Sequence, residues 1–78
     1  MDGKKLVKMA NEIAAFFAAE PERKTAVAGV AAHLKRFWEP RMRCEILAVL
    51  DRGGEHGMVP LVVEALQTNR KALEPAAK

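Results

Sequence analysis

Three prolines divide this chain into segments that each carry the periodicity of an amphipathic helix. Pro21 ends the first segment, because the residue before a proline resists the α conformation. Pro40 and Pro60 stand where a helix would begin, since a helix tolerates a missing N–H at its first position. Between the prolines, apolar side chains recur at the i, i+3, i+4 spacing that indicates a helix. The pattern predicts four helices, over residues 4–20, 23–38, 40–52 and 60–69.

The predicted fold is all-α, a small bundle of three to four helices in a single domain that spans residues 1–78. The link between the first two helices is short, which favours an antiparallel helical hairpin with two further helices packed on it. The apolar positions of these two helices also correspond, as in either an internal duplication or two helices that meet the same packing demand. The third helix has a broad apolar stripe, which predicts contacts on two sides. Residues 70–78 follow a polar stretch and are predicted to be a frayed tail.

A chain of 78 residues has a thin margin of stability, because it buries only roughly 60% of its unfolded surface. Cys44 is the single cysteine, so no disulfide can form within the chain. Cys44, His33 and His56 are too few and too far apart in sequence for a structural zinc site. Stability must therefore come from tight helix packing or from a partner.

The start of the chain does not resemble a secretory leader, because lysines interrupt every apolar run there. No stretch approaches the ~20 apolar residues that span a bilayer. A single unpaired cysteine suits a reducing compartment. We therefore expect a cytoplasmic protein that makes no contact with a membrane.

The sequence offers little for catalysis. Serine and tyrosine are absent, and Cys44 lies on the side of the third helix away from its apolar stripe. A nucleophilic thiol needs a base beside it and a lowered pKa, and neither His33 nor His56 is near it in sequence. The loop at residues 53–57 is rich in glycine but lacks the spacing of a phosphate-binding motif. We predict no catalytic, cofactor-binding or metal-binding residue in this chain.

The charge balance bears on a second class of function, a small basic helical nucleic-acid-binding protein. The net charge is +3, from 13 basic and 10 acidic residues, and the basic residues are scattered. A nucleic-acid footprint is usually a denser stripe. In a helix-turn-helix arrangement the third helix would present Met42, Ile46 and Leu50 to the groove, with few side chains that read bases. The sequence therefore disfavours this alternative.

The stretch Phe-Trp-Glu-Pro-Arg-Met-Arg, residues 37–43, is the best candidate for binding a partner. Arginine in the first turn of a helix costs roughly 0.3–1 kcal/mol against the helix dipole. Arg41 can offset this cost by pairing with Glu45 at i+4, whereas Arg43 needs a partner elsewhere, either Glu39 or a group on another protein. Aromatic, Met and Arg side chains are enriched at interface cores. The predicted partner-binding residues here are Phe37, Trp38, Pro40, Arg41, Met42 and Arg43.

Two simpler alternatives remain open. Phe37 and Trp38 could close the open end of the hairpin, with the arginines in solvent. Asn11 lies away from the main stripe among small residues, either as an exposed polar side chain or as part of a second docking face. We include Asn11 among the predicted partner-binding residues.

Several of these motifs resemble one known family. The run MANEIAAFF at residues 9–17 resembles the opening MANQIAxFF signature of the delta subunit of soluble, NAD-dependent, molybdenum-containing formate dehydrogenases. The runs VAAHL and FWEPRMR resemble that family's VAxHLxxFWxPRMR block, and the likeness spans roughly residues 6–66. The sequence departs from the signature at Glu12, where the family has glutamine.

The resemblance implies an accessory subunit without catalytic residues or bound cofactors of its own. Its implied partner is the catalytic alpha subunit, which carries a molybdopterin guanine dinucleotide cofactor and iron–sulfur clusters. The beta and gamma subunits, which carry FMN and further clusters, are further implied partners. The implied role is in assembly, molybdenum-cofactor maturation or stability of the complex, and Arg41 or Arg43 would lie near cofactor phosphates if it acts in maturation. Self-association of the isolated chain is a further expectation.

Overall fold

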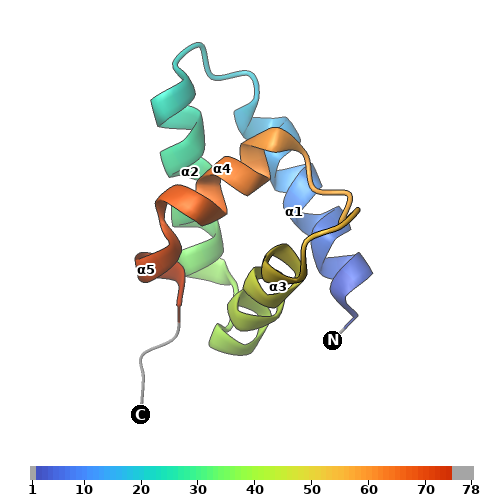
Figure 1. The fold of residues 1–78 in the computed structure, drawn as a ribbon. Coiled ribbons are helices and arrows are strands. Elements are labelled where there is room, and N and C mark those ends of the chain that lie inside the picture. The colour runs from blue at the N-terminus through green and yellow to red at the C-terminus, as the bar shows by residue number, and fades with distance from the viewer. Residues whose placement is uncertain (1, 75–78) are drawn as a thin grey trace.

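The fold is a small all-α bundle, as the sequence predicts. The computed structural model describes residues 2–74, and within that range every regular element is a helix. The helices are α1 (Gly3–Phe17), α2 (Arg23–Phe37), α3 (Pro40–Arg52), α4 (Pro60–Thr68) and α5 (Arg70–Leu73). Figure 1 shows α1 and α2 as an antiparallel hairpin, with α4 crossing the hairpin and α3 beside the start of α1.

Local chemistry fixes most helix ends. The Asp2 carboxylate accepts a hydrogen bond from the Lys4 N–H at 3.1 Å and so caps α1. Pro40 and Pro60 begin α3 and α4, and Gly53 ends α3 with a φ of 73°, a value that glycine adopts without strain. Helix α1 ends at Phe17 rather than at residue 20, because the chain turns there and the Glu20 N–H bonds to the Phe17 carbonyl oxygen at 3.0 Å.

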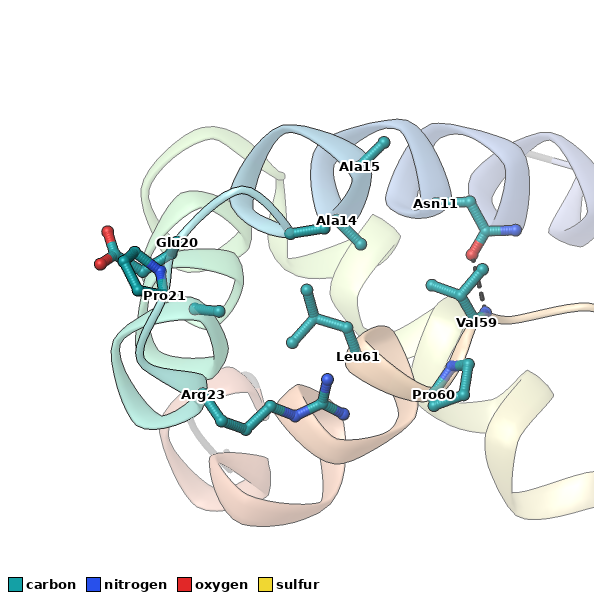
Figure 2. A pocket seen from close by; sticks show the side chains of 11 residues that line it. Asn11, Ala14, Ala15, Glu20, Pro21, Arg23, Val59, Pro60 and Leu61 are labelled. Atoms are coloured by element: carbon teal, nitrogen blue, oxygen red, sulfur yellow. Dashed lines mark hydrogen bonds between the residues drawn. The ribbon is translucent and has the colours of Figure 1, made fainter.

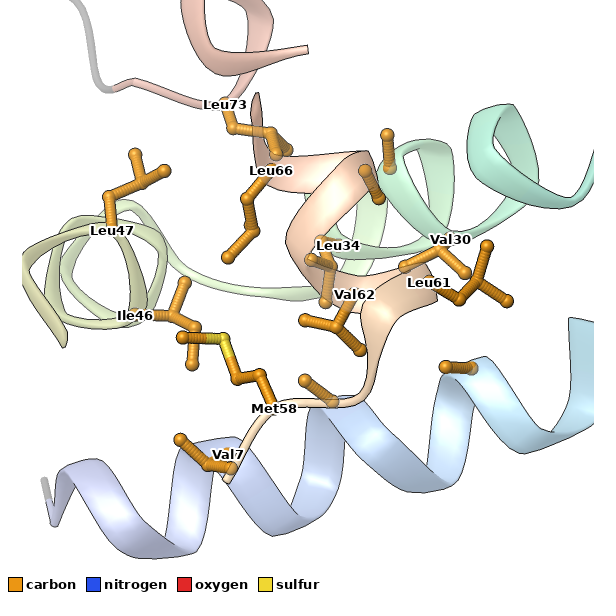
Figure 3. Packing of buried hydrophobic residues seen from close by; sticks show 14 of the residues in the cluster. Val7, Val30, Leu34, Ile46, Leu47, Met58, Leu61, Val62, Leu66 and Leu73 are labelled. Carbon is orange, nitrogen blue, oxygen red and sulfur yellow. The ribbon is translucent and has the colours of Figure 1, made fainter. Parts of the chain in front are cut away.

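The core lies where the hairpin meets the other helices. The Cα trace measures 37 × 27 × 18 Å, so the thinnest dimension holds about two layers of helix. Helix α3 contacts α1 on one side and α5 on the other, in agreement with its broad apolar stripe. Figure 3 shows Met58, from the loop before α4, among side chains of α1, α3 and α4. The largest fully buried side chains are Leu6, Val30, Leu34, Ile46, Val62, Leu66 and Leu73.

The prediction of a frayed tail from residue 70 is wrong for the part that the structure describes. Residues 70–73 form α5, and Leu73 is buried against the core. Two cations bond to the last carbonyl oxygens of α5: Lys35 Nζ donates to Ala72 at 3.1 Å and Arg43 Nη1 donates to Leu73 at 3.2 Å. Both charges suit the negative end of a helix. Residues 75–78 lie outside the described range.

Arg70 also holds α5 against α3. Its guanidinium donates to both Asp51 carboxylate oxygens, at 2.8 and 2.6 Å, and to Glu74 at 2.8 Å. The hydrogen bonds between Arg70 and Asp51 lower the pKa of Asp51 below its ordinary value. A carboxylate whose pKa is lowered in the folded protein stabilises it above the unfolded pKa, and the effect is lost as the pH falls through the folded value.

We expect the attachment of α5 to weaken when the pH falls below about 4. Protonation of Asp51 removes the charged acceptor that joins Arg70 to α3, so the amides of residues 70–74 should exchange faster with deuterium relative to those of α2. Asp51→Asn is the matched control. In this variant the amides of residues 70–74 should exchange fast at every pH, so the pH dependence should be lost. Equal protection in the two proteins at neutral pH would contradict the assignment.

Candidate functional site

Four aromatic rings form a continuous row along the seam between α1 and α2. Phe16 and Phe17 meet edge to face with centroids 5.1 Å apart, and the next two steps, to His33 and then to Phe37, measure 6.4 and 4.7 Å. We call these four residues the aromatic face. Phe16 is 77% exposed and Phe37 is 64% exposed, so the face presents apolar surface that residues 2–74 leave uncovered.

A groove of about 510 Å³ runs along the same seam. Phe16, Phe17 and His33 line it together with Trp38, which lies at its base and is only 5% exposed. Three further residues of α1 also line the groove: Met9, Glu12 and Ile13.

Gly29 allows Phe17 to pack closely against α2. A Cβ atom at Gly29 would lie 2.5 Å from two carbons of the Phe17 ring, closer than real contacts allow. The ring therefore occupies the space above the glycine, and from there it reaches His33.

We expect Gly29→Ala to lower the free energy of unfolding by about 1 kcal/mol. Displacing the Phe17 ring costs about 1–3 kcal/mol, and the higher helix propensity of alanine returns up to about 1 kcal/mol. Urea denaturation followed by circular dichroism measures the net change. Ala28→Gly, at an exposed neighbour, measures the propensity alone. A stabilised Gly29→Ala protein would contradict the close packing.

Trp38 and Phe37 are adjacent in sequence but have opposite environments. Trp38 follows the last residue of α2 with an extended backbone, and its N–H bonds to the Leu34 carbonyl oxygen at 2.9 Å. The change from helical to extended backbone turns its side chain into the core, whereas Phe37 remains on the surface. Of the predicted partner-binding residues, Phe37 is therefore accessible and Trp38 supports it from beneath.

The two arginines at the start of α3 also differ. Arg43 is half-buried and bonds within the chain to Leu73, and its Nε atom is buried without a hydrogen-bond partner among residues 2–74. Within the chain the acceptor of Arg43 is therefore the end of α5 and not Glu39, which the sequence offered as a candidate. Arg41 is exposed beside the exposed Pro40.

The predicted ion pair between Arg41 and Glu45 is also absent. Ion pairs among residues 2–74 join Arg23 to Glu64, and Arg70 to Asp51 and Glu74. A carboxylate oxygen of Glu45 instead lies 3.7 Å from the Cβ position of Gly3, at the positive end of α1. An i,i+4 ion pair in which the cation comes first in sequence is the weaker order. The position of Glu45 near the positive end of α1 is therefore favoured over a pair with Arg41.

Met42 is half-buried and packs against the core. Ile46 is fully buried, so the apolar side of α3 faces the bundle interior. The residues that the helix-turn-helix alternative would present to the groove, Met42, Ile46 and Leu50, therefore belong to the core or pack against it.

Asn11 joins α1 to the loop before α4. Its side-chain amide donates to the Gly57 carbonyl oxygen at 2.9 Å, and its oxygen accepts from the Val59 N–H at 3.0 Å. Figure 2 shows the second bond at the edge of a pocket of about 400 Å³. The small side chains of Ala14, Ala15 and Ala18 leave this space between α1 and Leu61. The polar atoms of Asn11 are thus already bonded within the chain, which sequence spacing could not indicate.

The remaining candidates are isolated from one another. Cys44 is exposed on α3, and His56 accepts through Nδ1 from the Met58 N–H at 3.1 Å. Within residues 2–74, no three His, Cys, Asp or Glu side chains are placed to hold a metal ion. None of the helices in this part of the chain is long and apolar enough to cross a membrane.

Comparison with known proteins identifies the family. No curated protein and no solved structure matches the chain. Residues 5–66 match the family model described as the NADH-dependent formate dehydrogenase delta subunit FdsD. The matched range contains most of α1, all of α2 and α3, most of α4 and the whole aromatic face, and it ends before α5. The chain therefore belongs to the FdsD family of formate dehydrogenase delta subunits.

Proposed function

We propose that this chain is a non-catalytic accessory subunit that binds the catalytic alpha subunit of a cytoplasmic formate dehydrogenase. It would support assembly of the complex, maturation of the molybdenum cofactor or stability of the assembled complex. The observation that carries the proposal is the match to the delta-subunit family over residues 5–66. The molybdopterin guanine dinucleotide, iron–sulfur clusters and FMN would be held by the other subunits, with contacts to the beta and gamma subunits as a further part of the proposal.

The exposed residues at the junction of α2 and α3 support this proposal. Phe37, which belongs to the aromatic face, is exposed there together with Pro40 and Arg41. Large aromatic and arginine side chains often dominate binding energy at interfaces. Of the other predicted partner-binding residues, Trp38, Met42 and Arg43 would position this surface through the core and α5, and Asn11 would act through the loop before α4.

Co-purification tests the binding. A tagged chain would be produced with the other subunits of its source, and the complex would be assayed for stoichiometry and formate-dependent NAD reduction. We expect Phe37→Ser or Arg41→Glu to weaken association with the alpha subunit by about 30-fold. Lys71→Glu, a charge reversal on the exposed side of α5, should leave it unchanged. Unaltered co-purification of both variants would rule out this surface.

Cofactor analysis separates maturation from assembly. The alpha subunit would be made with and without this chain, and its molybdenum and guanine nucleotide contents compared. A role in maturation predicts lower contents of both without the chain. Equal contents with reduced yield of the complex would instead restrict the role to assembly or stability.

A further inference from the structure

Two charged side chains lie beside the aromatic face, on opposite sides of the seam. Glu12 lines the groove from α1. The Arg36 guanidinium, on α2, lies 5.6 Å from the centre of the Phe37 ring. Within residues 2–74, neither takes part in an ion pair.

The two charges lie at about the same height along the hairpin. Met9 and Trp38 line the same groove, and Phe17 meets His33 further along. Glu12 lies between Met9 and Phe17 on α1, and Arg36 lies between His33 and Trp38 on the antiparallel α2. The face therefore has one negative edge and one positive edge at a common level.

We propose that two copies of this chain associate through their aromatic faces about a two-fold axis parallel to α1 and α2. Rotation about that axis places α1 of each copy opposite α2 of the other, and leaves the height along the helices unchanged. Glu12 of each copy then faces Arg36 of the second copy. In this dimer, α1 and α2 of both copies form an antiparallel four-helix bundle at the interface, a common helix packing.

The partner that covers the aromatic face is a second copy of the chain, because this surface is complementary to itself. A face with both signs at one level satisfies its own charges when it is rotated by two-fold symmetry, whereas a partner of one sign would leave either Glu12 or Arg36 unpaired. Burial of Phe16 and Phe37 would supply the apolar contribution.

Sedimentation equilibrium of the chain alone tests the contact. We expect a concentration-dependent dimer that Phe16→Lys weakens at least about 30-fold. Because Phe16 is 77% exposed, this variant should keep its circular dichroism spectrum. Val59→Lys, at an exposed apolar residue outside the face, should dimerise normally. A monomer at about 1 mM, or a dimer that Phe16→Lys leaves intact, would overturn the proposal.

Charge exchange tests the arrangement within the dimer. Glu12→Arg and Arg36→Glu should each weaken association by about tenfold, because like charges then oppose each other twice. The double variant should recover to within about threefold of the original protein, since both pairs re-form with their signs exchanged. A double variant as weak as the single variants would exclude the two-fold packing. No other subunit is present, so the result is independent of whether the chain binds the alpha subunit.

Discussion

Replacement of Trp38 by alanine should lower the free energy of unfolding by about 3–5 kcal/mol. The side chain is 5% exposed and forms part of the single core cluster described for residues 2–74. Its removal leaves a cavity beneath the groove, where neighbouring residues are already fixed by helix packing. A domain of this size has roughly 4–12 kcal/mol of stability in total, so the substitution should remove a large share of that stability.

Phe37→Ala is the matched control for this change. It removes an aromatic ring from the adjacent position, but that ring is 64% exposed, so the cost should be below about 1 kcal/mol. Urea denaturation followed by circular dichroism suits both variants, because Trp38 is the single tryptophan and its loss removes the fluorescence signal. Similar costs for the two substitutions would contradict the placement of Trp38 in the core.

This pair of variants also separates stability from binding. Trp38→Ala would reduce any complex by unfolding the chain, whereas Phe37→Ala would do so while the fold remains intact. A loss of association in the second variant alone can therefore be assigned to the surface. Sequence patterns place both residues in the same block and give no means of distinguishing their roles.

Helical periodicity predicted the main elements because it reports which side of each segment is apolar. Leu6, Val30, Leu34 and Ile46 are all fully buried, as their spacing indicates. Periodicity is less informative at the edge of a stripe, where one residue can face either way. Phe16 has the helical spacing of an apolar-stripe position, three residues after Ile13, yet it is exposed while Phe17 packs on Gly29.

Contacts between distant residues account for most of what the sequence did not reveal. Helix α5 looks polar and short, but Lys35 and Arg43, which are 37 and 30 residues away from their acceptors, bond to its last carbonyl oxygens. The arginine that seemed to require another protein thus has one acceptor within the chain, at the end of α5. Of the predicted partner-binding residues, Phe37, Pro40 and Arg41 are left as the exposed ones.

Asn11→Ala should lower the free energy of unfolding by about 1–2 kcal/mol. The substitution removes two hydrogen bonds that connect α1 to Gly57 and Val59, each contributing about 1 kcal/mol. The higher helix propensity of alanine offsets roughly half of the free energy of one of these bonds. The loop also carries Met58 into the core. Release of the loop should therefore loosen the packing of Met58 in addition to removing the two hydrogen bonds.

Asn11→Asp divides the effect between the two bonds. A carboxylate can still accept from the Val59 N–H, but it cannot donate to the Gly57 carbonyl oxygen and would repel it. Deuterium exchange should therefore show fast exchange of the Val59 amide in Asn11→Ala and slower exchange in Asn11→Asp. Lys8→Ala, at an exposed site on the same helix, should leave that amide protected. If Val59 stays protected in Asn11→Ala, another group must hold the loop, and Asn11 would again be available to a partner.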